Sequence, residues 1–168
     1  MDFLEIWLVR FMGGRSEGWL YLTVMLDLFS RQVVGWSIGP RMTKKLVADA
    51  LRMFWFRRRP PAGLIVHSDR GSQNCSKEYQ DALSACGMRS SMSRKADCWD
   101  NAPTESLQGS LNRARKHDNR FTTRQEAQYE VMDWLALYNA KRLHSTLGYV
   151  SPMKFERNWL AAHARKSA

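Results

Sequence analysis

The stretch that decides the fold is a short apolar run that ends in an aspartate, Leu64-Ile65-Val66-His67-Ser68-Asp69. The run follows Pro60-Pro61 and Gly63, and an apolar run of this length after turn signals is typical of a buried strand. Asp69 is therefore predicted at the end of a strand, where Gly71 lets the backbone turn away.

A second carboxylate follows at the start of a predicted helix. Pro103 suits the first helical position, and Glu105 then lies in the first turn, where the helix dipole favours a negative charge. Thirty-five residues separate Asp69 from Glu105. Two carboxylates on rigid supports suit a divalent cation, which prefers oxygen ligands. The alternative is that both are ordinary capping or solvated groups.

The remaining segments predict an α/β fold. Three antiparallel strands come first, over residues 1–11, 19–26 and 32–38, and a further short strand covers 88–92. Helices are predicted after the capping residues Thr43, Ser76 and Thr123, over 103–116, and as a short helix from Pro152. Strands that then alternate with helices predict a mixed sheet with helices on its faces.

Composition limits the classes of function. The chain carries 26 Lys and Arg against 16 Asp and Glu, a formal charge of +10, which favours polyanions such as nucleic acid. A merely basic protein remains the alternative, while the scattered positions of the basic residues argue against a membrane surface. No apolar run approaches the ~20 residues of a membrane span, and three cysteines without a C-x-x-C pair predict a reduced cytoplasmic protein.

The chain has the length of one domain. Its 168 residues can bury a sizeable core. We predict one compact unit over residues 1–157 and a C-terminal extension over 158–168.

Several ordered motifs carry a resemblance to a known family. The chain is similar to the catalytic core of insertion-sequence transposases related to retroviral integrases, the DDE superfamily, over roughly residues 17–157. The motifs are His67-Ser68-Asp69-Arg70-Gly71-Ser72-Gln73, Asp97-Cys98-Trp99-Asp100-Asn101-Ala102, Glu105-Ser106, Leu26-Asp27-Leu28-Phe29-Ser30-Arg31, Val33-Val34-Gly35-Trp36, His144-Ser145-Thr146-Leu147-Gly148-Tyr149 and Ser151-Pro152.

The resemblance implies an RNase H-like fold and phosphoryl transfer in DNA. In this family two Mg²⁺ or Mn²⁺ ions, held by three carboxylates, activate a water or a 3′-hydroxyl and stabilise the leaving oxygen. Asp69 matches the second carboxylate of the pattern and Glu105 the third.

The first carboxylate is not where the family usually has it. Alignment back from Trp19 without gaps puts Val9 at that position. Asp2, in Met1-Asp2-Phe3, is the alternative that we favour, although it lies on the second residue of the chain. Asp27 matches a hairpin motif and is expected to have a structural role.

Basic residues near the two carboxylates are expected to contact DNA. Arg94 and Lys95 lie in the polar loop before the Glu105 helix, and Arg113 adjoins a position where the family commonly carries Lys or Arg. His67 is expected to pack and orient its neighbours. For His144 and Tyr149, core support and DNA contact both stay open.

The function implied by the resemblance is DNA strand transfer at mobile-element ends and a target, as in DNA integration and transposition. The expected setting is a bacterial cytoplasm at the nucleoid, as a homo-oligomer, with a companion DNA-binding region or protein supplied elsewhere. The chain is expected to be an N-terminally truncated copy, inactive if the first Asp is missing or displaced. The alternative is a non-catalytic DNA-binding or subunit-association remnant without a complete triad. An RNase H-like nuclease fits the flanking motifs less well.

Overall fold

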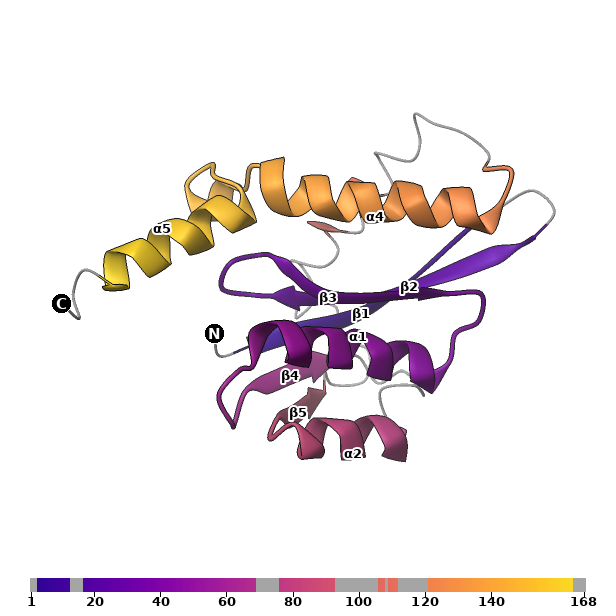
Figure 1. Ribbon diagram of the computed structural model, residues 1–168, viewed down its shortest axis with the longest axis horizontal. Helices are drawn as coiled ribbons and strands as arrows, with labels where there is room; N and C mark the ends of the chain where they lie inside the picture. Colours follow the sequence, from indigo (N-terminus) through magenta and orange to yellow (C-terminus); the bar gives the residue numbers. More distant parts are fainter. Residues whose placement is uncertain are drawn as a thin grey trace.

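A five-stranded mixed sheet forms the centre of the protein (Figure 1). The computed structural model describes residues 3–12, 17–68, 76–92, 106–107, 109–111 and 121–164. The strands lie in the order β3-β2-β1-β4-β5. Their bounds are β1 (Phe3–Met12), β2 (Trp19–Asp27), β3 (Val33–Gly39), β4 (Ile65–Ser68) and β5 (Arg89–Met92).

The pairing of the strands confirms the predicted lead of three antiparallel strands. β1 pairs with β2 and β2 with β3 in antiparallel fashion, whereas β4 is parallel to both β1 and β5. β1 is therefore central, with a hairpin partner on one side and a crossover partner on the other. The C-terminal end of β4 consequently lies beside the first half of β1.

The helices begin where their capping residues predict. The Thr43, Ser76 and Thr123 side chains each accept a hydrogen bond from the backbone three residues on, which satisfies a free amide of the first turn. The helices are α1 (Lys44–Arg58), α2 (Lys77–Ala85), α4 (Arg124–Lys141) and α5 (Pro152–Ala164), with a 3₁₀ turn η2 (Ser145–Leu147) before α5.

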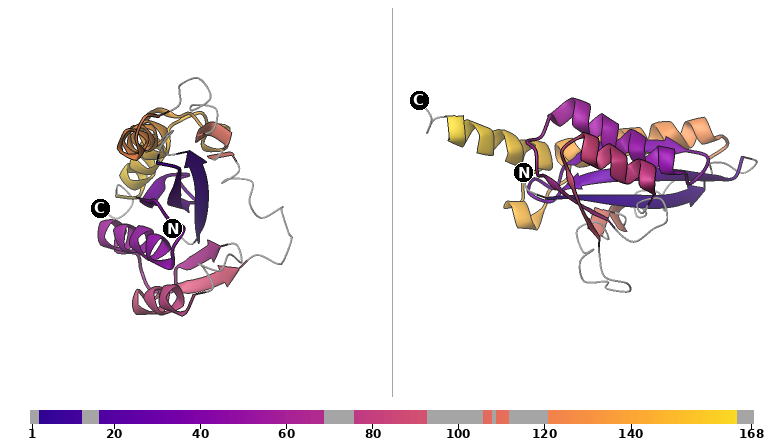
Figure 2. Two further views of the ribbon diagram at one scale, coloured as in Figure 1. Left: turned by 90° about the vertical axis from the view of Figure 1, so that its right-hand side faces the viewer. Right: turned by 90° about the horizontal axis from the view of Figure 1, so that it is seen from below.

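Two hydrophobic clusters lie on opposite faces of the sheet. α1 and α2 cover one face and α4 covers the other, so the sheet is the middle of three layers (Figures 1 and 2). Along β1 the side chains alternate between the faces: Leu4 and Ile6 pack in the cluster with α1 and α2, and Val9 packs in the cluster with α4. The buried residues of α1 and α4 face the sheet, and Trp134 of α4 is partly buried against it.

α5 is longer than the short helix expected from the sequence. It covers 13 residues, and the predicted boundary at residue 157 falls within it. Phe29 of the β2–β3 turn contacts two of its rings, with centroids 5.3 Å from Phe155 and 5.4 Å from Trp159. Arg58 at the end of α1 also donates to the Glu156 carboxylate at 2.9 Å. These contacts fix α5 against the sheet's hairpin.

Within the part of the chain that the structure describes, no helix combines the length and apolarity that crossing a membrane requires.

Candidate active site

The six residues predicted to form the site lie outside the described residues. They are the carboxylates Asp2, Asp69 and Glu105 and the basic residues Arg94, Lys95 and Arg113. The structure does describe the residues next to two of the carboxylates: Ser68, before Asp69, and Ser106, after Glu105.

Asp69 comes directly after the C-terminal end of β4 in the sequence. Ser68 is the last residue of this strand and pairs with Ile6 of β1, while His67 pairs with Glu5. Asp69 follows Ser68 directly in the sequence and itself lies outside the described residues.

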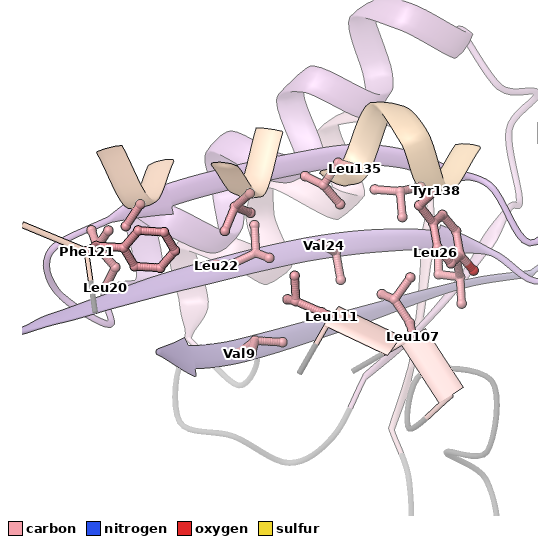
Figure 3. Close-up of a cluster of buried hydrophobic side chains, with 13 residues drawn as sticks. Val9, Leu20, Leu22, Val24, Leu26, Leu107, Leu111, Phe121, Leu135 and Tyr138 are labelled. Carbon is pink, nitrogen blue, oxygen red and sulfur yellow. The ribbon is translucent and has the colours of Figure 1, made fainter. Parts of the chain in front are cut away.

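Glu105 comes directly before a helical segment that lies on the face of the sheet that carries α4. Residues 106, 107, 109, 110 and 111 are helical, and Leu107 and Leu111 are buried in the same cluster as Val9 and Leu26 (Figure 3). Glu105 precedes Leu107 by two residues. The described residues next to the two predicted carboxylates thus lie on β4, which pairs with β1, and on the face of the sheet that carries α4.

A third carboxylate, Glu5, lies in the middle of this arrangement and was not predicted from the sequence. It is on β1, is only 1% exposed, and pairs with His67 of β4 on one side and Leu26 of β2 on the other. Such a buried acid usually has a partner or a metal, since burial disfavours its charged form. In the sequence, Glu5 stands out only as a single acid inside a long, mostly apolar strand. Its neighbours in the sheet follow from the pairing of the strands and not from the local sequence.

His67 has the packing role that the sequence predicted. Its Nδ1 lies 3.2 Å from the Ser91 Oγ, on the neighbouring strand β5 and in register with it. Among the described residues no three His, Cys, Asp or Glu side chains meet as a possible cation site. A site with three carboxylates here therefore requires residues beyond the described ones.

Asp27 has the structural role expected for it. It is completely buried, and its carboxylate accepts hydrogen bonds from the Phe29 backbone N–H at 3.1 Å and from the Ser30 hydroxyl at 2.6 Å. Both donors belong to the β2–β3 turn. This acid holds the turn closed.

A group of basic and aromatic side chains joins the end of α4 to the β2–β3 turn. The rings of Tyr138 and His144 meet edge to face with centroids 5.2 Å apart, and the Arg142 guanidinium lies 5.9 Å from the Tyr138 ring centroid. Burial, then the charges of Arg142 and Arg31, lower the pKa of His144. Burial raises the pKa of Tyr138 to about 12, so this ring is a neutral part of the core.

Comparison with known families identifies the domain. One model of an integrase core domain matches residues 1–98, and a second matches residues 86–152. Among similar proteins, the "Transposase InsF for insertion sequence IS3A" of Escherichia coli (strain K12) is 47% identical over 147 residues, which cover 87% of this chain and 51% of the relative. The "Insertion element IS600 uncharacterized 31 kDa protein" of Shigella sonnei is 44% identical over 145 residues, which cover 86% of this chain and 53% of the relative. The chain thus spans about half the length of these curated relatives.

A solved structure has the same fold. A chain in the cryoEM structure of the simian T-cell lymphotropic virus intasome in complex with PP2A regulatory subunit B56 gamma superposes with a TM-score of 0.73 at 15% identity, over 92% of this chain and 53% of that one. This match and the sheet order confirm the predicted RNase H-like α/β fold. The first family match alone covers more than half of the chain and all five strands of the sheet, and the chain therefore belongs to the integrase core domain family.

Proposed function

We propose that this chain is the catalytic core of a transposase that carries out metal-dependent strand transfer on DNA. The observation that carries the proposal is the parallel pairing of β1 with the end of β4, which holds a buried acid, Glu5, beside the strand that leads into Asp69. A buried acid on the central strand of an integrase-type sheet, with a second acid directly after the neighbouring strand in the sequence, suits hard divalent cations.

Asp69 and Glu105 act in this proposal as ligands for two Mg²⁺ or Mn²⁺ ions, together with an acid from the start of the chain, Asp2 or Glu5. When bound, the ions polarise the attacking oxygen and stabilise the charge on the leaving oxygen.

The proposed reaction exchanges one phosphodiester bond for another. A 3′-hydroxyl oxygen forms a bond to phosphorus and gives up its proton, while the phosphorus bond to the departing 3′-oxygen breaks and that oxygen is protonated. Arg94, Lys95 and Arg113 neutralise phosphates along the bound strands, which positions the DNA without reading its sequence.

The partners in this proposal are mobile-element ends and a target DNA, in a bacterial cytoplasm at the nucleoid. A homo-oligomer would bring two ends together, and a companion DNA-binding region or protein would select those ends.

The direct test is metal-dependent nicking of supercoiled plasmid by the purified chain, followed by joining of an added 3′-hydroxyl oligonucleotide. We expect Mn²⁺ or Mg²⁺ to support nicking and EDTA to stop it. Asp69→Asn and Glu105→Gln should each reduce nicking to the EDTA level, because each removes a metal ligand. Asp81→Asn, on the exposed side of α2, is the matched control and should nick like the wild type.

Metal-independent nicking, or nicking that survives both ligand substitutions, would contradict the proposal. DNA binding without any nicking by the wild-type chain would favour the non-catalytic alternative, a DNA-binding or subunit-association remnant.

A further inference from the structure

We propose that the end of α4 and the β2–β3 turn together form a binding site for a phosphate group of a DNA strand, held by the side chains of Arg31, Arg142 and His144. None of the three belongs to the set of residues that the sequence predicted for the active site. The anion site stands independently of the proposed function, whereas its assignment to DNA rests on that function.

Two segments far apart in the sequence bring these side chains together at one end of the sheet (Figure 1). Arg31 lies in the β2–β3 turn, Arg142 directly follows α4, and His144 directly precedes η2. The rings of His144 and Tyr138 meet with centroids 5.2 Å apart, and the Arg142 guanidinium lies 5.9 Å from the Tyr138 ring centroid. After burial, the charges of Arg142 and Arg31 are what lower the pKa of His144, and the same two charges act on Tyr138. The four side chains therefore form one group.

Hydrogen bonds to the backbone hold the two segments in place around this group. The Asn139 side chain bonds to both backbone groups of Val33: its Oδ1 accepts from the N–H at 2.9 Å, and its Nδ2 donates to the carbonyl oxygen at 2.9 Å. Arg31 lies two residues before Val33. The His144 backbone N–H donates to the Val150 carbonyl oxygen at 3.2 Å, which closes the loop that carries the ring. The backbone around the three side chains is thus fixed by the fold itself.

Each of the three side chains places one buried nitrogen where no protein acceptor lies. These atoms are Arg31 Nη1, Arg142 Nε and His144 Nε2, and none has a hydrogen-bond partner within the described part of the chain. Neither guanidinium forms an ion pair with an acid among the described residues. Buried polar nitrogens and cations are normally paired, because burial takes away their water. Three such nitrogens in one group indicate a ligand with several oxygen acceptors and a negative charge.

The acids of the neighbouring elements do not neutralise this group. Asp27 accepts its hydrogen bonds within the β2–β3 turn, and Glu156 of α5 is paired with Arg58. Glu130 and Asp133 of α4 are exposed to solvent. The group therefore keeps the two permanent charges of its arginines.

A phosphate group suits this arrangement of donors. A guanidinium is a planar fork whose N–H groups match two phosphate oxygens at once. The net charge of +10 favours a polyanion as the source of that phosphate, and a DNA strand offers one phosphate per nucleotide. Such a contact positions the strand without reading its sequence.

The site would hold DNA at the end of the sheet where β1 begins. The β2–β3 turn is at that end, because Asp27 at the end of β2 pairs with Leu4 near the start of β1. β4 runs parallel to β1, so its C-terminal end points away from the turn. The phosphate site therefore extends the DNA contact beyond the end of β4.

The first test is titration of the full chain with sulfate, which keeps its charge between pH 5.5 and 7.5, followed by NMR of the histidine rings. The His144→Gln variant assigns the signal. We expect sulfate to raise the pKa of His144, because a bound anion offsets the charges of the two arginines. Sodium chloride at the same ionic strength controls for screening and should have a smaller effect. A purely structural role of His144 would give no response specific to sulfate.

Substitutions of the two arginines test the ligands themselves. Arg31→Gln and Arg142→Gln should each weaken sulfate binding by about tenfold or more, since a hydrogen bond to a charged group contributes at least that much. Arg142→Lys keeps the charge but lacks the fork, so its affinity should lie between those of the wild type and Arg142→Gln. The matched control is Arg41→Gln. Arg41 is exposed and lies two residues after β3, as Arg31 lies two residues before it, and the variant should bind sulfate like the wild type.

The second test distinguishes a phosphate of DNA from a free anion. The salt dependence of binding to duplex DNA, measured by fluorescence anisotropy, should have a slope lower by about 1 in Arg142→Gln, because one phosphate contact is lost. Arg41→Gln should keep the slope of the wild type. Circular dichroism of each variant checks that the fold is retained.

The outcomes separate this inference from the proposed function. If sulfate left His144 of the wild type unchanged, the anion site would be wrong, whatever the result of plasmid nicking. Sulfate binding that is lost in both Gln variants while the DNA slope stays at its wild-type value would show a site for a free anion and contradict the assignment to DNA. The expected sulfate and DNA results, obtained with a wild-type chain that nicks no plasmid, would support the phosphate site and contradict the catalytic function alone.

Discussion

At the scale of single residues, His144 should make the stability of the protein depend on pH. Its pKa in the folded protein is below the ordinary value of 6.5, because the ring is partly buried and because Arg142 and Arg31 repel its charged form. The unfolded chain therefore takes up the proton at a higher pH than the folded chain does. The stability that neutral His144 contributes is complete above about pH 6.5 and is lost as the pH falls through the lower, folded pKa.

We therefore expect the free energy of unfolding, measured with urea, to fall between pH 7 and pH 5, and to fall less in His144→Gln. Arg142→Gln should also reduce the fall, since of the two arginines Arg142 lowers the pKa of His144 more. An unchanged pH dependence in both variants would show that His144 is not the group responsible.

Two buried acids show what the sequence could and could not reveal at this scale. The role of Asp27 was predicted because its partners, Phe29 and Ser30, are two and three residues away in a recognisable hairpin motif. The position of Glu5 depends on its alignment with Leu26 and His67, which are 21 and 62 residues away. No local pattern in the sequence contains that alignment, which only the pairing of the strands gives.

At the scale of elements, the contact of α1 with β3 leaves no room for a side chain at Gly35. A Cβ there would lie 2.6 Å from the Ala50 carbonyl oxygen and 3.0 Å from the Phe54 Cβ. Gly35→Ala must therefore move the helix away from the strand, and overpacking of this kind costs about 1–3 kcal/mol. Urea denaturation should show the loss as a lower midpoint with an unchanged slope.

Gly39→Ala is the matched control on the same strand. Its Cβ would lie 3.1 Å from the Leu46 Cδ1, the end of a flexible side chain, and at an ordinary contact distance of 4.0 Å from the Arg41 carbonyl oxygen. We expect a smaller loss than for Gly35→Ala. Equal losses in the two variants would mean that the close approach of α1 does not limit position 35.

Most helices and strands were predictable because their signals are local. Thr43, Ser76 and Thr123 mark helix starts through hydrogen bonds within three residues, and the buried residues of α4 recur at intervals of three or four: Ala127, Val131, Leu135 and Tyr138. The full length of α5 was not predicted, because the residues that it contacts, Phe29 and Arg58, lie far away in the sequence.

At the scale of the whole molecule, the order of the strands places segments that are far apart in the sequence side by side. The parallel pairing of β1 with β4 brings the start of the chain next to the residue before Asp69, and the α4 side of the sheet receives the helix that follows Glu105 (Figure 2). The motif resemblance implied this fold, whereas periodicity alone supported only an α/β class. The net charge of +10 is a property of the whole molecule and should attract polyanions such as DNA.

This charge should make DNA binding depend strongly on salt, because phosphate contacts release condensed counterions. If six or more phosphates are contacted, the affinity for random duplex DNA should fall about 10³-fold or more between 50 and 200 mM salt, as fluorescence anisotropy would measure. Replacing Arg94 and Lys95 together by Ala should lower the salt slope by about 2 and weaken binding to all sequences alike.

The matched control is the adjacent pair Lys44 and Lys45 on α1. These two lysines are already ion-paired with Glu78 and Asp49, so their replacement by Ala should leave the salt slope unchanged. A slope that falls equally in the two double variants would show that general charge, and not the loop before Glu105, determines the contact with DNA.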